Sequence, residues 1–125
     1  MGLSLVLLAV LGAPPERPAF RVDVTAPASC KRATTCEAKL RLVALDGFKV
    51  NDEYPFKFVG DAPNVVFEGT GKFVHENKTS GTMTIKFRVD AAGKVNVAGL
   101  FKLSVCTSDM CKIERPKISF AVPVT

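Results

Sequence analysis

Residues 82–89 read TMTIKFRV, a run in which four apolar side chains alternate with four polar ones. Alternation with a period of two is typical of a β-strand that has one face in a core and the other face in solvent. We therefore predict that Ile85 and Phe87 point inward and that Lys86 and Arg88 face solvent. This run is the clearest strand signal in the chain, and the rest of the sequence repeats it.

The same alternation recurs on both sides of this run, in residues 20–24, 37–44, 56–58, 95–97, 101–105 and 118–124. Turn-forming residues separate the runs, at Asp46-Gly47, Gly60–Pro63, Asn77–Gly81 and Ala91–Gly93. No stretch keeps a helical period of 3.6 residues. Seven to nine short strands at this spacing predict an all-β fold, an immunoglobulin-like antiparallel β-sandwich, with a small closed barrel as the alternative.

The N-terminal residues differ from the rest of the chain. Residues 1–11 read MGLSLVLLAVL, an apolar run too short to span a bilayer and typical of an export signal. We predict an export segment at residues 1–13, a Pro-rich spacer at 14–19 and one domain at 20–125. The protein would then be periplasmic or secreted. The alternative is that the apolar run is a buried strand.

The formal net charge of the chain is +5, which favours acidic partners. Many basic residues, such as Lys39 and Lys102, lie at outward strand positions, as expected for a solvated strand face. Single-stranded nucleic acid would require exposed aromatic side chains among the basic ones. The aromatic residues have the inward parity instead, so no nucleic-acid partner is predicted.

Four cysteines form two close-spaced pairs, Cys30 with Cys36 and Cys106 with Cys111. Four cysteines permit three pairings, of which the local one is the simplest. A loop this short gains only roughly 2 kcal/mol from a disulfide on the chain-entropy model, which argues mildly that one pair has another purpose.

The second pair is chemically the more interesting. Cys106 ends an apolar strand and Cys111 begins the next, so the pair is predicted at the tip of a β-hairpin, where a partner thiolate can reach it. Lys112 would favour a thiolate at this pair and Asp109 would oppose it. A purely structural hairpin clip remains an alternative.

Other chemistries fit the sequence less well. Four cysteines suffice for a zinc site by number, but Cys30 and Cys36 are spaced more widely than the usual two to four intervening residues, and an oxidising compartment disfavours such a site. Blue copper needs two histidines, and the chain has one, His75, which we predict to be an exposed loop residue. There is no nucleophile elbow for a Ser-His-Asp triad. No metal and no cofactor are predicted.

Residues 100–124, LFKLSVCTSDMCKIERPKISFAVPV, contain a strand, a cysteine, a short polar loop, a second cysteine, an acidic residue and a closing alternating strand. In this pattern the chain resembles the N-terminal periplasmic domain of the thiol:disulfide interchange protein DsbD, over about Phe20 to Val124. The resemblance implies an immunoglobulin-like fold and thiol–disulfide oxidoreductase activity. It also implies two partners, a membrane-embedded electron donor and exported thioredoxin-like proteins.

The resemblance assigns roles to individual residues. Cys106 and Cys111 match the redox pair, with Cys111 as the sulfur that links to the partner, and Glu114 matches the acidic residue that follows. Phe73 matches the aromatic residue of a cap that shields the pair, with Phe67 as the second choice. Lys112 supports the pair by its charge.

Two features favour a different function. Lys112-Ile113 stands where the family has Tyr-Pro-Pro after the second cysteine, and Cys30 and Cys36 have no counterpart in the redox family. The alternative is therefore a non-enzymatic binding module of the cell envelope, in which both cysteine pairs are structural disulfides.

Overall fold

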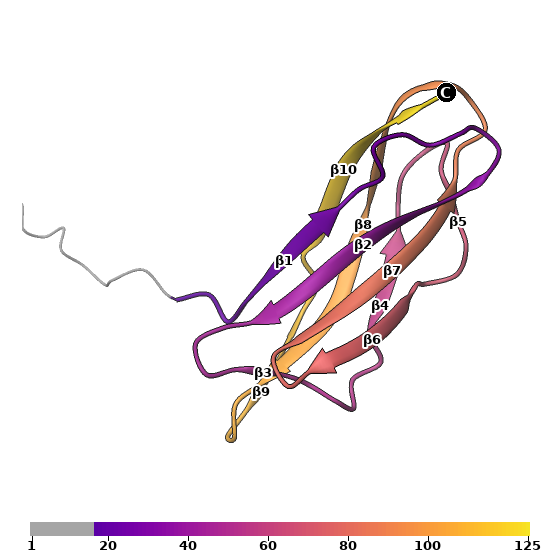
Figure 1. The fold of residues 1–125 in the computed structure, drawn as a ribbon. Helices are drawn as coiled ribbons and strands as arrows, with labels where there is room; N and C mark the ends of the chain where they lie inside the picture. Colours follow the sequence, from indigo (N-terminus) through magenta and orange to yellow (C-terminus); the bar gives the residue numbers. More distant parts are fainter. Residues whose placement is uncertain (1–16) are drawn as a thin grey trace, which may run out of the picture.

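Ten β-strands make up the fold of residues 17–125, which are the residues that the computed structural model describes (Figure 1). In chain order they are β1 (Phe20–Thr25), β2 (Thr35–Ala44), β3 (Lys49–Val50), β4 (Lys57–Gly60), β5 (Val66–Phe67), β6 (Lys72–Asn77), β7 (Ser80–Arg88), β8 (Gly93–Cys106), β9 (Cys111–Glu114) and β10 (Lys117–Val124). The predicted export segment and the first half of the Pro-rich spacer, residues 14–16, lie outside the described residues.

The strands form two antiparallel sheets. In the first sheet, β2 and β7 lie between β1 on one side and the short strands β5 and β6 on the other. In the second sheet, β8 is central, with β10 and β9 along one edge and β3 and β4 along the other. The short strands β5 and β6 share one position beside β7, and β3 with β4 and β9 with β10 share one position each beside β8. Counted by position, four strands face three, which is the arrangement of a constant-type immunoglobulin domain, so the fold is an immunoglobulin-like β-sandwich.

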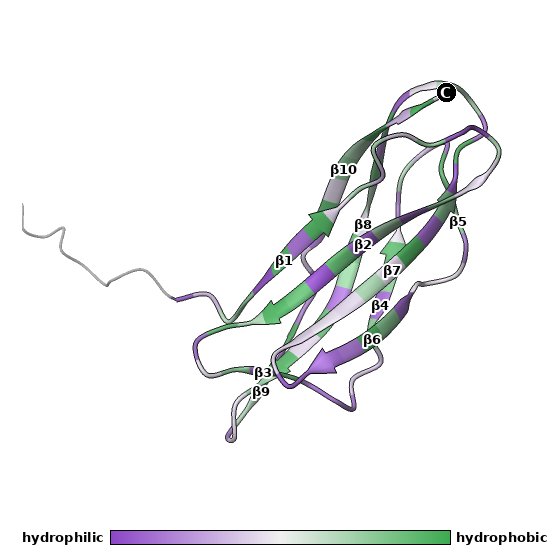
Figure 2. Cartoon of the chain, viewed as in Figure 1, coloured by the Kyte–Doolittle hydropathy of each residue, from purple (hydrophilic) through white to green (hydrophobic). Residues whose placement is uncertain are grey.

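The core lies between the two sheets and is built from the predicted inward positions. Its largest fully buried side chains include Phe58 of β4, Phe87 of β7 and Phe101 of β8. Along β2, buried and exposed residues alternate over almost the whole strand, because only one face of that strand meets the core. Figure 2 shows this as hydrophobic and hydrophilic bands in turn along β2 and β7.

Strand β8 differs from its prediction. Residues 95–97 and 101–105 are not two strands but parts of one, which runs from Gly93 to Cys106. The odd-numbered residues keep one inward parity throughout, and Gly99 continues the strand where β4 packs closest. A Cβ atom at Gly99 would overlap the Phe58 ring and would lie 2.5 Å from the carbonyl oxygen of Val59.

Two further predictions are corrected. His75 lies in strand β6 and not in a loop, because the polar stretch that contains it pairs with β7. Val24 is 41% exposed although its parity is inward, because it lies near the end of the edge strand β1. His75 is exposed, as predicted. Val24 shows that sequence alternation predicts burial poorly on an edge strand, where a neighbour on one side is missing.

Candidate functional site: the cysteine hairpin

The hairpin of β8 and β9 places Cys106 directly opposite Cys111. The backbone N–H of Thr107 donates to the carbonyl of Met110 over 2.8 Å, and the Thr107 hydroxyl accepts from the N–H of Met110 over 3.2 Å. These bonds close a four-residue turn. The two cysteines then meet as cross-strand neighbours, with Cα atoms 4.0 Å apart, and are joined by a disulfide. The predicted hairpin is therefore confirmed.

The two cysteines differ in exposure. Cys111 is exposed, whereas Cys106 is half-buried at the end of β8. Met110 and Ile113, on either side of Cys111 in the sequence, are 50% and 59% exposed. Figure 1 shows the hairpin tip at the end of the sandwich opposite the C-terminus, where nothing drawn lies beyond it. An incoming thiolate therefore has its freest approach to Cys111.

Lys49, which no sequence motif indicates as a site residue, lies beside Cys106. Strand β3 pairs with the end of β8 so that Lys49 is opposite Cys106. The turn before β3 has two residues with positive φ, Asp46 at 52° and Gly47 at 84°, and this conformation favours Gly and Asp. Gly47, Lys49 and Cys106 line a hollow of about 320 Å³ together with Thr107 and Ser108.

Asn51 connects Cys111 to strand β8. Its Nδ2 donates to the hydroxyl of the fully buried Ser104 over 3.2 Å and lies 3.9 Å from Sγ of Cys111. Its backbone N–H donates to the Ser104 carbonyl. An amide donor at this position can stabilise negative charge that develops on Cys111.

The other residues expected near the pair take different positions. Lys112 follows Cys111 in β9, so the two side chains lie on opposite faces of the sheet. The Nζ of Lys112 lies 5.4 Å from the centroid of the Phe48 ring. Glu114 is half-buried and lies opposite Leu103, a core residue. Lysine 49, and not Lys112, therefore shares the face of the disulfide.

Phe73, the predicted cap aromatic, lies in β6 of the first sheet. Its ring stacks on Phe56 at 4.0 Å between centroids and meets His75 edge-on at 4.9 Å. Phe67 packs beside Phe58 at 5.9 Å. These contacts hold the segment between β3 and β4, which begins with Asn51, against β6.

The first cysteine pair also forms a disulfide, at the other end of the sandwich. Cys30 is 2% exposed and Cys36 is 9% exposed. The Cys30 N–H donates to the carbonyl of Pro123, and the Thr125 N–H donates to the carbonyl of Cys30, both over 2.9 Å. The disulfide therefore joins the segment before β2 to β2, the backbone hydrogen bonds of Cys30 join that segment to the end of β10, and both cysteines are shielded.

The described residues contain no cluster of three or more His, Cys, Asp and Glu side chains that could hold a metal ion. His75 is near one carboxylate, with Nδ1 3.9 Å from Oδ1 of Asp52. No helix of residues 17–125 is long and apolar enough to cross a membrane.

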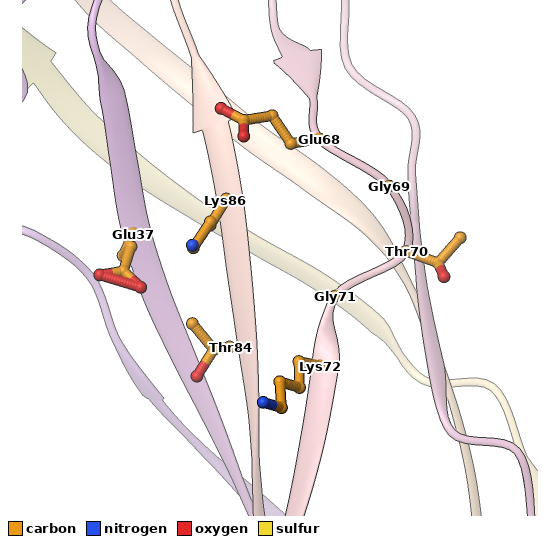
Figure 3. Close-up of a pocket in the computed structure, with 8 residues that line it drawn as sticks. All are labelled: Glu37, Glu68, Gly69, Thr70, Gly71, Lys72, Thr84 and Lys86. Carbon is orange, nitrogen blue, oxygen red and sulfur yellow. The ribbon is translucent and has the colours of Figure 1, made fainter.

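A second hollow, of about 420 Å³, lies on the outer face of the first sheet (Figure 3). Lys86 from β7 and Lys72 from β6 line it together with Glu37 from β2 and with Glu68. Glu37 is the direct cross-strand neighbour of Lys86. The hollow therefore combines both signs of charge, which largely offset one another.

Arginine–carboxylate pairs occupy the same outer face. The Arg41 guanidinium donates to Glu76 over 3.0 Å and, with the Thr82 hydroxyl, lowers the pKa of that carboxyl. Arg88 donates to Asp90 over 2.8 Å and lowers the pKa of Asp90. On the first sheet, these two arginines are thus matched by carboxylates.

No family model and no curated protein sequence matches the chain. Among solved structures, the N-terminal domain of DsbD from Neisseria meningitidis in the reduced form is similar at 11% identity and a TM-score of 0.45, over 84% of this chain and 85% of that one. A cohesin module from a Clostridium perfringens family 33 glycoside hydrolase is similar at 8% identity and a TM-score of 0.44, over 85% of this chain and 96% of that one.

AggA, the major subunit of aggregative adherence fimbriae type I from Escherichia coli, is similar at 11% identity and a TM-score of 0.44, over 90% of this chain and all of that one. These three proteins are of different kinds: a DsbD domain, a cohesin module and a fimbrial subunit. None of these similarities carries an assignment of function to this chain.

Proposed function

We propose that the chain is an exported thiol–disulfide exchange module that acts through Cys106 and Cys111, as the N-terminal domain of DsbD does. The observation that carries the proposal is the exposed disulfide at the hairpin tip, with Cys111 open to solvent and Lys49 opposite Cys106. Two disulfides within one small domain also favour an oxidising compartment such as the periplasm.

The exchange proceeds in two steps. A partner thiolate attacks Sγ of Cys111, the bond between the two sulfurs breaks, and its electron pair leaves on Cys106 as a thiolate. The ammonium of Lys49 favours that thiolate. The second thiolate of the partner then attacks the mixed disulfide and releases Cys111, so that the partner is oxidised and the hairpin pair is reduced.

Single-cysteine variants test the order of attack. The Cys106→Ser variant keeps the exposed Cys111 and is expected to form a mixed disulfide with oxidised glutathione several-fold faster than the Cys111→Ser variant, which keeps the half-buried Cys106. Mass spectrometry after rapid acid quenching measures both rates. Equal rates, or a faster reaction at Cys106, would contradict the proposed role of Cys111.

A binding module with two structural disulfides is the competing function. It is favoured by the direct cross-strand position of Cys106 and Cys111, since such a pair also clips a four-residue turn. In that case both disulfides stay oxidised at the potentials of thiol-exchange proteins, and a Cys106→Ser, Cys111→Ser double variant keeps its partner. The proposed exchange function predicts that this double variant folds but transfers no electrons.

A further inference from the structure

The outer face of the second sheet carries a set of lysines in line with the disulfide. We call it the lysine face, and define it by Lys49, Lys57, Lys102 and Lys117 together with the apolar side chains of Val59, Leu100 and Ile113. These residues share one side of the sheet, because cross-strand partners point to the same face and alternate residues do so along each strand.

The register arranges the lysine face in four rows. Val59 and Lys117 flank Leu100, and Lys57 is opposite Lys102. Ile113 is opposite Ser104, and the last row has Lys49 and Cys111 on either side of Cys106. Rows two residues apart are spaced by about 7 Å, so the face extends about 20 Å from Leu100 to the disulfide.

Along its strands, the charge on this face is of one sign, while Asp109 lies beyond them in the hairpin turn. Of the residues in β3, β4, β8, β9 and β10, one is acidic, Glu114, and it lies opposite the core residue Leu103 and not on the lysine face. Within residues 17–125, none of the four lysines forms an ion pair; the ion pairs there involve arginine or histidine. The first sheet, by contrast, also carries acidic residues: Glu37 lies opposite Lys86, and Arg41 is paired with Glu76.

The pairing of Lys57 with Lys102 is unfavourable for the fold itself. The two lysines are direct cross-strand neighbours, and like charges in that position destabilise a sheet. An acidic residue at either position would relieve the repulsion. An acidic surface brought against the face by a partner would relieve it as well.

Apolar groups accompany the lysines. Val59 and Leu100 are direct neighbours and are each 38% exposed, and Ile113 is 59% exposed beside the disulfide. A non-obligate protein interface combines apolar and polar surface in about the proportions of the rest of the protein, and the lysine face has this mixed character. A lipid surface seated on the same lysines would cover the disulfide, so these observations favour a protein partner.

We propose that the lysine face docks an exchange partner whose thiols are flanked by acidic residues, and that it steers those thiols to Cys111. The inference rests on the proposed exchange function and adds the chemistry of the partner to it. Attraction between a lysine surface and an acidic one raises the encounter rate and weakens as salt screens it.

The test compares two dithiol probes of opposite charge with a neutral one. The probes are a Cys-X-X-Cys peptide flanked by glutamates, the same peptide flanked by lysines, and dithiothreitol. Each is added in excess to the oxidised protein, and alkylation with mass spectrometry follows the reduction of Cys106 and Cys111. The proteins are the wild type, a Lys57→Glu, Lys102→Glu double variant, and a Lys39→Glu, Lys72→Glu control.

The control changes net charge by the same amount on the other sheet, where Lys39 and Lys72 both flank Thr84. At low ionic strength, the Lys57→Glu, Lys102→Glu variant is expected to react about tenfold more slowly than the control with the acidic peptide and equally fast with dithiothreitol. The difference should shrink severalfold at an ionic strength of about 0.5 M.

The remaining outcomes separate the two proposals. If dithiothreitol reduces every protein but the acidic peptide reacts equally with both variants, the docking inference is wrong and exchange still stands. If dithiothreitol leaves the wild-type pair oxidised, the exchange function fails and the inference fails with it.

Anionic lipid is tested in parallel with phosphatidylglycerol vesicles. Sedimentation of the wild type but not of the Lys57→Glu, Lys102→Glu variant, together with equal peptide rates, would assign the face to a membrane and overturn the proposal. Folding is checked by chemical denaturation. The variant keeps a like-charge pair at the same two positions, so its midpoint should match that of the wild type.

Discussion

At the scale of single residues, Lys49 is the charged residue proposed to act on Cys106. It lies opposite Cys106 across β3 and β8, so its ammonium is positioned to stabilise the thiolate that leaves when the disulfide is attacked. The neighbouring Lys112 lies over the Phe48 ring instead. The two lysines therefore make different predictions.

Lys49→Glu is expected to slow the reduction of Cys106 and Cys111 by dithiothreitol about threefold to tenfold at low ionic strength, because it places a negative charge beside the leaving thiolate. Lys49→Arg should keep the rate, and Lys112→Glu is the matched control. Stopped reactions with alkylation measure all three. An equal slowing by Lys112→Glu would show that net charge, and not the position of Lys49, matters.

Phe87 tests the core at the same scale. It is fully buried in β7 between the sheets, as its place in the run TMTIKFRV predicts. Phe87→Ala is expected to lower the free energy of unfolding by about 3–5 kcal/mol, because a large aromatic side chain leaves a cavity. Chemical denaturation measures the loss, and a value below about 1 kcal/mol would contradict the packing of this ring.

At the scale of elements, the pairing of β4 with β8 combines stability with the proposed docking. Lys57 and Lys102 repel one another across these strands. The Lys57→Glu single variant should be more stable than the wild type by about 0.2–1 kcal/mol, because it replaces a like-charge pair with an attractive one.

The matched control for this prediction is Lys39→Glu in β2, whose neighbour in β7 is Thr84. Its stability should stay within about 0.5 kcal/mol of the wild type, as for most surface substitutions. Chemical denaturation of both variants decides the matter. A Lys57→Glu variant less stable than the control would show that no repulsion exists between the two lysines.

The elements also show what sequence can and cannot predict. Strands β2 and β7 are long, lie inside a sheet and have one buried face, so local alternation in Leu40 or Ile85 predicts their core positions well. The sequence also predicts the inward positions of β8, but the apolar alternation is interrupted at Gly99. It therefore predicts two strands where the structure has one. Strand boundaries of this kind depend on what packs against a glycine.

Contacts between elements that are far apart in the chain could not be predicted from the sequence. Strand β3 has two residues, too few for any alternation, and yet it brings Lys49 to Cys106. Asn51 meets Ser104 and Cys111 for the same reason. The hairpin pair itself could be predicted because the two cysteines flank one turn and need no long-range register.

At the scale of the whole molecule, the sandwich separates the two disulfides. Cys30 and Cys36 are buried where the segment before β2 meets the end of β10, while Cys106 and Cys111 form the hairpin at the other end (Figure 1). A shielded disulfide resists thiol attack, and an accessible one permits it. The two pairs should therefore differ in both rate and potential.

The reduction potential of the hairpin pair tests the exchange function most directly. Titration in glutathione and dithiothreitol buffers, with alkylation and mass spectrometry of each cysteine peptide, resolves the two pairs separately. We predict a potential above about −300 mV for Cys106 and Cys111, with Cys30 and Cys36 still oxidised where the hairpin pair is reduced. A potential below about −300 mV for Cys106 and Cys111 would mark a structural bridge and contradict the proposed function.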